Sequence, residues 1–187
     1  MKRLVVLAGC VVLVTAFAGC QNGAKGKDGV KFAVAGGGRF PRSLAGTWKD
    51  SETGWEFVFE RDGTISSAVI ESGLLRVRPG QKTIPIKTEK GQGVYEMGPW
   101  GALYSPQDRE LSISVVIDRY VFELKSFGVE GASSDYFVGP VSQDWQTWTA
   151  EWYSFPTFRA FAENEQDLVF EQDMNDVPAT TIVFRKQ

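Results

Sequence analysis

Aromatic side chains alternate with other residues along short segments of this chain, and turn-forming residues separate the segments. Trp55, Phe57 and Phe59 occupy every second position. Side chains of a strand point alternately to its two faces, so this spacing predicts a strand with one aromatic face. Asp62-Gly63 follows and favours a tight hairpin, because glycine accepts the positive φ of the turn. Residues 64–70 are then predicted to return as the antiparallel partner.

Similar short segments continue to the end of the chain and predict an all-β domain over residues 44–187. About eight to ten antiparallel strands at this spacing are typical of a closed barrel or of a β-sandwich. We favour the barrel, because closure removes the exposed strand edges that a large aromatic sheet would otherwise present. After the hairpin, the predicted strands are 74–77, 83–87, 94–97, 103–104, 111–117, 120–124, 136–141, 157–162, 168–171 and 180–185.

The tryptophan-rich segment 144–155 fits both a helix and a strand. Trp145, Trp148 and Trp152 lie three and four positions apart, which is the spacing of one helix face. Trp148, Ala150 and Trp152 also alternate with polar or mixed residues, as they would along a strand. Because aromatic residues favour strands, we predict a strand here and keep the amphipathic helix as the alternative.

The first predicted strand of the domain resembles the opening of lipocalin-like barrels, which carry a Gly-x-Trp motif. Gly46-Thr47-Trp48 provides that motif, and Ser134-Asp135-Tyr136 is similar to the Thr-Asp-Tyr turn of the same family. The resemblance implies that a late arginine, Arg159 or Arg185, stacks on the first-strand tryptophan and closes one end of the barrel. It also implies a barrel that holds one small apolar ligand.

The chain has a second Gly-x-Trp triplet, Gly98-Pro99-Trp100. Proline sets the φ of a turn and cannot donate a hydrogen bond to a sheet, so this triplet is predicted in a turn near a sheet edge. We therefore expect Trp48 to belong to the core and Trp100 to contribute less to stability.

The N-terminus has the three parts of a secretory signal over residues 1–19. Lys2 and Arg3 are followed by an apolar stretch over 4–17, and small residues precede Cys20. A permanent membrane helix needs about 20 consecutive apolar residues, and this run is shorter. Residues 17–20, Phe-Ala-Gly-Cys, resemble the lipobox of bacterial lipoproteins. That resemblance implies that Cys20 is lipidated and becomes the first mature residue, held at a membrane outside the cytoplasm in the cell envelope.

Ordinary signal cleavage after 16–18, an Ala-x-Ala site, is the alternative. It would release a soluble protein with one free thiol at Cys20, because Cys10 lies within the signal and no other cysteine exists. A lone exposed thiol is a liability in an oxidising compartment, whereas lipid attachment gives Cys20 a role. The later residues contain no cysteine and must fold without a disulfide.

The segment 20–43 is basic and glycine-rich, and we predict that it is a flexible linker. A basic linker next to a lipid can contact anionic headgroups. The residues after Arg42 include 13 basic and 22 acidic side chains, a formal net charge of −9. An acidic domain is repelled by nucleic acid, so no nucleic-acid partner is predicted. The basic linker residues are Lys25, Lys27, Lys31, Arg39 and Arg42, against the single acid Asp28.

The residues that usually carry catalysis and metal binding are scarce. The chain has no histidine, which removes the commonest general base and the commonest metal ligand. The acidic cluster 173–176 lacks the central glycine and closing glutamate of a calcium loop. We therefore predict a non-enzymatic protein without catalytic residues, metal or cofactor.

Two functions fit these features. The first is an anchored interaction or envelope-structural module that presents a surface to a protein or cell-wall partner. The alternative is a lipocalin-like binder of an apolar or amphipathic small molecule inside the barrel. In that case the candidate ligand-binding residues are Trp55, Trp145, Trp148 and Trp152.

Overall fold

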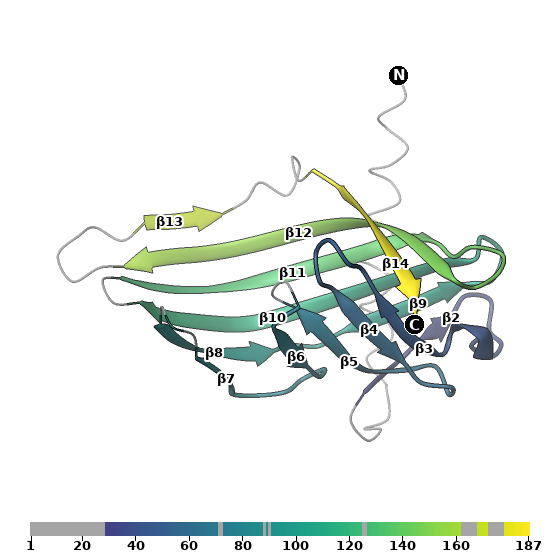
Figure 1. Ribbon diagram of the computed structural model, residues 1–187, viewed down its shortest axis with the longest axis horizontal. Coiled ribbons are helices and arrows are strands. Elements are labelled where there is room, and N and C mark those ends of the chain that lie inside the picture. Colours follow the sequence, from purple (N-terminus) through teal and green to yellow (C-terminus); the bar gives the residue numbers. More distant parts are fainter. Residues whose placement is uncertain are drawn as a thin grey trace.

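The computed structural model describes residues 29–70, 73–87, 89, 91–124, 127–161, 168–171 and 178–187. These residues form one 14-stranded sheet that curls on itself into a barrel-like shape (Figure 1). The predicted all-β fold is confirmed. No helix in the described part of the chain has the length and apolar character to span a membrane.

The sheet consists of strands of very different length. One short 3-10 helix lies between the second and third strands in the chain. The elements are β1 (Val30–Lys31), β2 (Ala33–Val34), η1 (Arg42–Leu44), β3 (Gly46–Lys49), β4 (Glu56–Phe59), β5 (Thr64–Ile70), β6 (Leu75–Val77), β7 (Ile84–Lys87), β8 (Gly91–Met97), β9 (Gly101–Ser105), β10 (Glu110–Leu124), β11 (Gly128–Pro140), β12 (Thr147–Phe161), β13 (Leu168–Glu171) and β14 (Thr180–Lys186).

Most of the barrel is an antiparallel meander. β3, β4 and β5 pair in chain order, as do β9, β10, β11 and β12. β14 then pairs with both β12 and β3, and so joins the C-terminal strands to the first hairpin. Arg185 lies opposite Lys49 at this junction.

The N-terminal segment closes the remaining gap between β5 and β9. Val30 lies opposite Ile65 in an antiparallel ladder, and Ala33 lies opposite Leu103 in a parallel one. The sequence predicts a linker as far as residue 43, so the folded domain begins earlier than predicted. Val30, Phe32 and Val34 alternate with Lys31 and Ala33, and this period of two is the strand signal within the basic segment.

The closed part of the sheet consists of β1–β5, β9, β14 and the adjoining ends of β10, β11 and β12, and we call it the barrel half. Aromatic rings fill its interior. Trp148 stacks on Phe184 with 4.6 Å between ring centroids, and Phe57 lies 5.3 Å from Phe137. The indole N–H groups of the two fully buried tryptophans are paired: Trp48 Nε1 donates to the carbonyl of Leu44 at 2.8 Å, and Trp148 Nε1 donates to that of Gly139 at 3.1 Å. These two rings therefore enter the core without leaving an unpaired donor. The largest fully buried rings are those of Trp48, Trp148, Phe57, Phe59, Phe137 and Phe184.

The segment 144–155, predicted as strand rather than helix, lies in β12 only from Thr147 onward, and residues 144–146 form the turn before it. Its first half pairs with β14 and its second half with β13, while β11 runs along its other side. Pro156 lies between the β14 and β13 ladders, where the described ladders give it a neighbour only in β11. Proline is tolerated at such half-paired positions because it lacks an N–H.

The strands β10, β11 and β12 extend beyond the barrel half, with β7 and β8 on one side and β13 on the other (Figure 1). The outer face of this extension carries linked ion pairs. Arg119 Nε contacts Glu130 at 3.0 Å and Arg159 contacts the same carboxylate at 3.0 Å. Hydrogen bonds from Arg159 and Arg119 lower the pKa of Glu130. These contacts mark the solvent side of the sheet.

Two details implied by the lipocalin resemblance differ in the structure. Ser134-Asp135-Tyr136 lies inside β11 and not in a turn. The cation–π contact among the described residues places Arg109 over Trp145, 4.0 Å from the ring centroid, and not an arginine over Trp48. Register explains the first difference, because residues 133–135 pair with β10 and β12 on either side.

Trp48 and Trp100 provide a matched test of core packing. Trp100 lies in the connection before β9, yet its ring is 6% exposed, so it is more buried than predicted. Its Nε1 has no hydrogen-bond partner among the described residues, whereas Trp48 Nε1 is paired. We expect Trp48→Phe to lose about 1–3 kcal/mol more stability than Trp100→Phe, because only the first leaves a buried carbonyl unpaired. Chemical denaturation of both variants measures the difference, and equal losses would contradict it.

Candidate functional site

Three of the four tryptophans predicted to bind a ligand pack within the protein itself. Trp148 is fully buried, and Trp55 is 7% exposed. Trp152 stacks on Phe137 with 6.1 Å between centroids, and Trp55 lies 4.8 Å from the same ring. These rings fill space that a ligand inside the barrel would need. Their role in ligand binding remains a prediction.

The fourth, Trp145, lies in the turn before β12, where its partly buried ring packs against the core with its centroid 6.5 Å from that of Tyr104. Its backbone has φ 61, and Arg109 covers its ring. The Arg109 guanidinium also donates to the carbonyls of Val141 and Ser142. Trp145 and Arg109 therefore fasten the β11–β12 turn to the start of β10. This arrangement explains both side chains by structure alone.

Asp135 is the one strongly buried acid near the ring cluster whose pKa is shifted. Trp152 Nε1 donates to its carboxylate at 2.9 Å, and Ser133 Oγ donates at 3.2 Å. Burial raises the pKa of Asp135, while the hydrogen bonds oppose that rise. The described residues place no cation against it. The carboxylate therefore orients Trp152 at the border between the barrel half and the extension.

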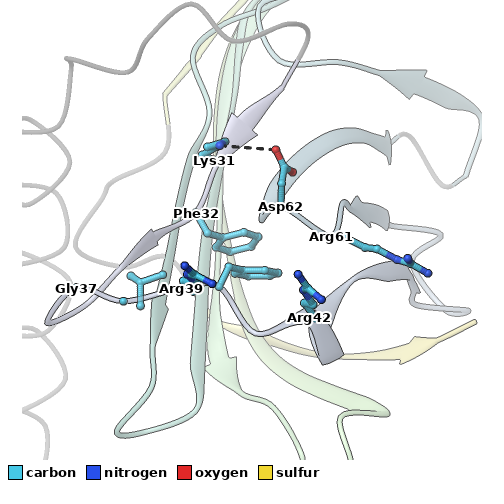
Figure 2. A pocket seen from close by; sticks show the side chains of 10 residues that line it. Lys31, Phe32, Gly37, Arg39, Arg42, Arg61 and Asp62 are labelled. Carbon is cyan, nitrogen blue, oxygen red and sulfur yellow. Dashed lines mark ion pairs between the residues drawn. The ribbon is translucent and has the colours of Figure 1, made fainter.

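A hollow lies beside the N-terminal segment, and we call it the cationic groove (Figure 2). Its volume is about 860 Å³, within the range of small-molecule sites, and it is open to solvent. It lies where β1, the η1 region and the β4–β5 turn meet. The groove is lined by Lys31, Phe32, Val34, Gly37, Gly38, Arg39, Phe40, Arg42, Arg61 and Asp62.

The floor of the cationic groove is aromatic. Phe32 stacks on Phe40 at 4.7 Å between centroids, and Phe40 contacts Tyr104 edge-on at 6.2 Å. The backbone N–H of Phe32 donates to the carbonyl of Gly63 at 2.8 Å. Gly63 has φ 79, and a Cβ built there would lie 2.7 Å from Phe40 Cβ. The hairpin turn and the N-terminal segment are therefore in direct contact beneath the groove.

The rim of the cationic groove carries four cations and one acid, all exposed. Lys31 Nζ lies 3.7 Å from the Asp62 carboxylate. A hydrogen bond from Thr64 is the main cause that lowers the pKa of Asp62, with a smaller contribution from the charge of Lys31. Arg39, Arg42 and Arg61 have no ion pair among the described residues. Figure 2 shows Arg39 and Arg42 on either side of Phe32, and Arg61 farther from it on the β4–β5 turn.

Sequence reasoning identified three of these four cations as linker charges but did not predict the groove. Lys31, Arg39 and Arg42 belong to the predicted basic segment, whereas Arg61 lies in the first hairpin turn. The alternation of apolar side chains over residues 30–34 indicates a strand, and it could have predicted that the basic segment lies against the sheet. The partner strand of that segment is not encoded locally.

Cys20 and the predicted signal peptide lie outside the described residues. The first described residue, Gly29, follows Cys20 by nine positions. No protein-family model, curated protein or solved structure matches the chain. Of the sites described above, the cationic groove has the residues nearest in sequence to Cys20, beginning with Lys31.

Asp135 generates a prediction about pH. Its pKa is higher in the folded than in the unfolded chain, so the unfolded chain releases the proton first as pH rises above the ordinary value of 3.8. We therefore expect wild-type stability to fall relative to Asp135→Asn as pH rises from that value. Asp62 is the matched control, because its pKa is lowered. The stability of the wild type should therefore rise relative to that of Asp62→Asn as pH rises toward 3.8. Denaturation across a pH series measures both, and parallel curves for wild type and Asp135→Asn would contradict the assignment.

Gly63 generates a prediction about the groove floor. Gly63→Ala and Gly80→Ala both place a side chain at positive φ, φ 79 and φ 66, which costs about 1–2 kcal/mol. Only Gly63→Ala also drives a methyl group into Phe40, because nothing lies within 4 Å of the Cβ position at Gly80. We expect Gly63→Ala to be less stable than Gly80→Ala by about 1–3 kcal/mol. Thermal unfolding compares the two variants. Equal losses of stability would show that the Phe40 side chain moves aside at no energetic cost, and would contradict the prediction.

Proposed function

We propose that this chain is a lipoprotein of the bacterial cell envelope, anchored through Cys20, whose β domain is a non-catalytic interaction module. The charged N-terminus, the apolar run and the small residues before Cys20 support export and lipid attachment. The domain begins within about ten residues of that cysteine and is held outside the cytoplasm, close to the membrane surface.

The observation that carries the interaction role is the filled interior. The rings of Trp48, Phe57 and Trp148 are fully buried and in contact with further rings. A barrel of about eight strands has room either for its own side chains or for one small ligand. Side chains occupy the barrel half, so the partner is bound on the outer surface. The alternative of an internal apolar ligand has no comparable support.

The chemistry of the described residues supports a non-catalytic role. Asp135, the buried acid with the raised pKa, is hydrogen-bonded to Trp152 and Ser133 and has the structural role described above. The whole chain lacks histidine. The cationic groove offers four fixed positive charges and a single carboxylate, Asp62, which is paired with Lys31. Its chemistry is that of a binding site for an anion.

The anchor is tested by replacing each of the two cysteines in turn. Cys20→Ala is expected to abolish incorporation of a fatty-acid label and to reduce the membrane-bound fraction, with thermal unfolding of the domain unchanged. A single acyl chain binds membranes with a constant on the order of 10⁴ M⁻¹, so stable anchoring needs the several chains of a lipoprotein. Cys10→Ala is the matched control, because Cys10 lies within the predicted signal. Labelling that persists in Cys20→Ala, or disappears in Cys10→Ala, would refute the anchor assignment.

A further inference from the structure

We propose that the cationic groove binds the phosphate of an anionic phospholipid headgroup and so turns this face of the domain toward the membrane. This inference rests on the proposed lipid anchor, which brings the groove near a membrane. It adds a second, non-covalent contact to that anchor.

The charge of the cationic groove suits a phosphate. Four cations and one acid line it, so its net charge is +3, while the residues after Arg42 carry a net charge of −9. Arg39, Arg42 and Arg61 form no ion pair among the described residues, and the one carboxylate of the groove, Asp62, is paired with Lys31. Guanidinium groups bind phosphate oxygens through paired hydrogen bonds. The acid Asp62 lies against Lys31, which leaves the three arginines for the ligand.

The floor of the groove suits the apolar part of a lipid next to its phosphate. Phe32 and Phe40 form a stacked pair at 4.7 Å, and Val34 continues this surface. Phe40 is partly buried against the core. A site with an apolar floor and a cationic rim matches an amphipathic anion better than a fully hydrated one.

The groove is held in shape before any ligand arrives. Val30 and Lys31 pair with β5, and Phe32 is hydrogen-bonded to Gly63 in the hairpin turn. The Asp62 carboxylate accepts a hydrogen bond from the Thr64 N–H at 3.1 Å, which fixes the turn that carries Arg61. A pre-organised site loses less entropy when it binds.

The position of the groove in the chain places it at the membrane. Lys31 follows Cys20 by eleven positions, and eleven residues can span at most about 36–40 Å. The lipid anchor therefore keeps headgroup phosphates at high local concentration around the groove. The acidic remainder of the domain is repelled by the same surface. Both effects orient the groove toward the bilayer.

The test uses the mature chain, residues 20–187, with Cys20→Ala, so that no lipid anchor contributes and every described residue is kept. Its binding is measured by co-sedimentation with phosphatidylglycerol–phosphatidylcholine vesicles and with pure phosphatidylcholine vesicles, with inorganic phosphate as competitor. The groove variant combines Arg39→Gln, Arg42→Gln and Arg61→Gln. The control combines Lys49→Gln, Arg78→Gln and Arg185→Gln, which removes the same charge from exposed residues outside the groove.

We expect binding to the anionic vesicles only. The groove variant should bind them on the order of 100-fold more weakly, because each basic residue near an anionic surface contributes about fivefold. The control should bind clearly more tightly than the groove variant. Equal losses in the two variants would overturn the proposal, because the net charge alone would then be responsible. Binding to inorganic phosphate but not to vesicles, or equal binding to both vesicle types, would overturn it as well.

The outcome is separable from the anchor. Fatty-acid labelling at Cys20 reports the proposed function, whereas vesicle binding of the unlipidated chain reports the groove. Circular dichroism of both triple variants is expected to match the parent, because all six side chains are exposed. A groove variant that keeps parental vesicle affinity would remove the headgroup site and leave the lipid anchor in place.

Discussion

The packing of tryptophan and phenylalanine rings inside the curled sheet is the interaction on which this structure depends. Both cysteines precede residue 21, so the domain has no disulfide and its apolar core must offset the entropy of ordering the chain. Phe57 shows how this works, because it contacts Phe59, Phe137, Trp148 and Phe184 from three other strands and its own. Strands far apart in the chain are joined by these rings.

The filled core determines where binding can occur. Since large rings occupy the barrel half, the open chemistry of the domain lies at its surface, and the aromatic residues that attract attention in the sequence serve mainly to stabilise the fold. Trp152 and Asp135 illustrate this: the indole N–H and the buried carboxylate satisfy each other at 2.9 Å. The groove is lined by residues of β1, β2 and η1, by the loop between β2 and η1 and by a hairpin turn, and its charged side chains stay accessible.

The N-terminal segment connects the fold to the proposed function. Residues 30–34 complete the sheet between β5 and β9, and the same residues begin one wall of the cationic groove. Phe40 then packs over Gly63, so the segment that closes the barrel through its ladders also supplies the floor of the groove. A lipid at Cys20 and a headgroup in the groove would act on a single short stretch of chain. The site closest to the predicted anchor is thus also the one built into the sheet.

The sequence by itself determined the all-β class, the core position of Trp48 and, from Thr147 onward, the strand predicted over 144–155. Period-two alternation and aromatic preference act between neighbouring residues and so can be recognised locally. It missed the strand at 30–34, where basic and glycine residues hid the alternation of Val30 and Phe32. Only the tertiary structure decided that Ala33 pairs with Leu103 and that Arg61 joins Arg39 and Arg42 around one groove. It likewise decided that Trp100 is buried and that Asp135 lies inside a strand. These features depend on which strands lie side by side, and that choice comes from how the whole aromatic core packs, which no local pattern encodes.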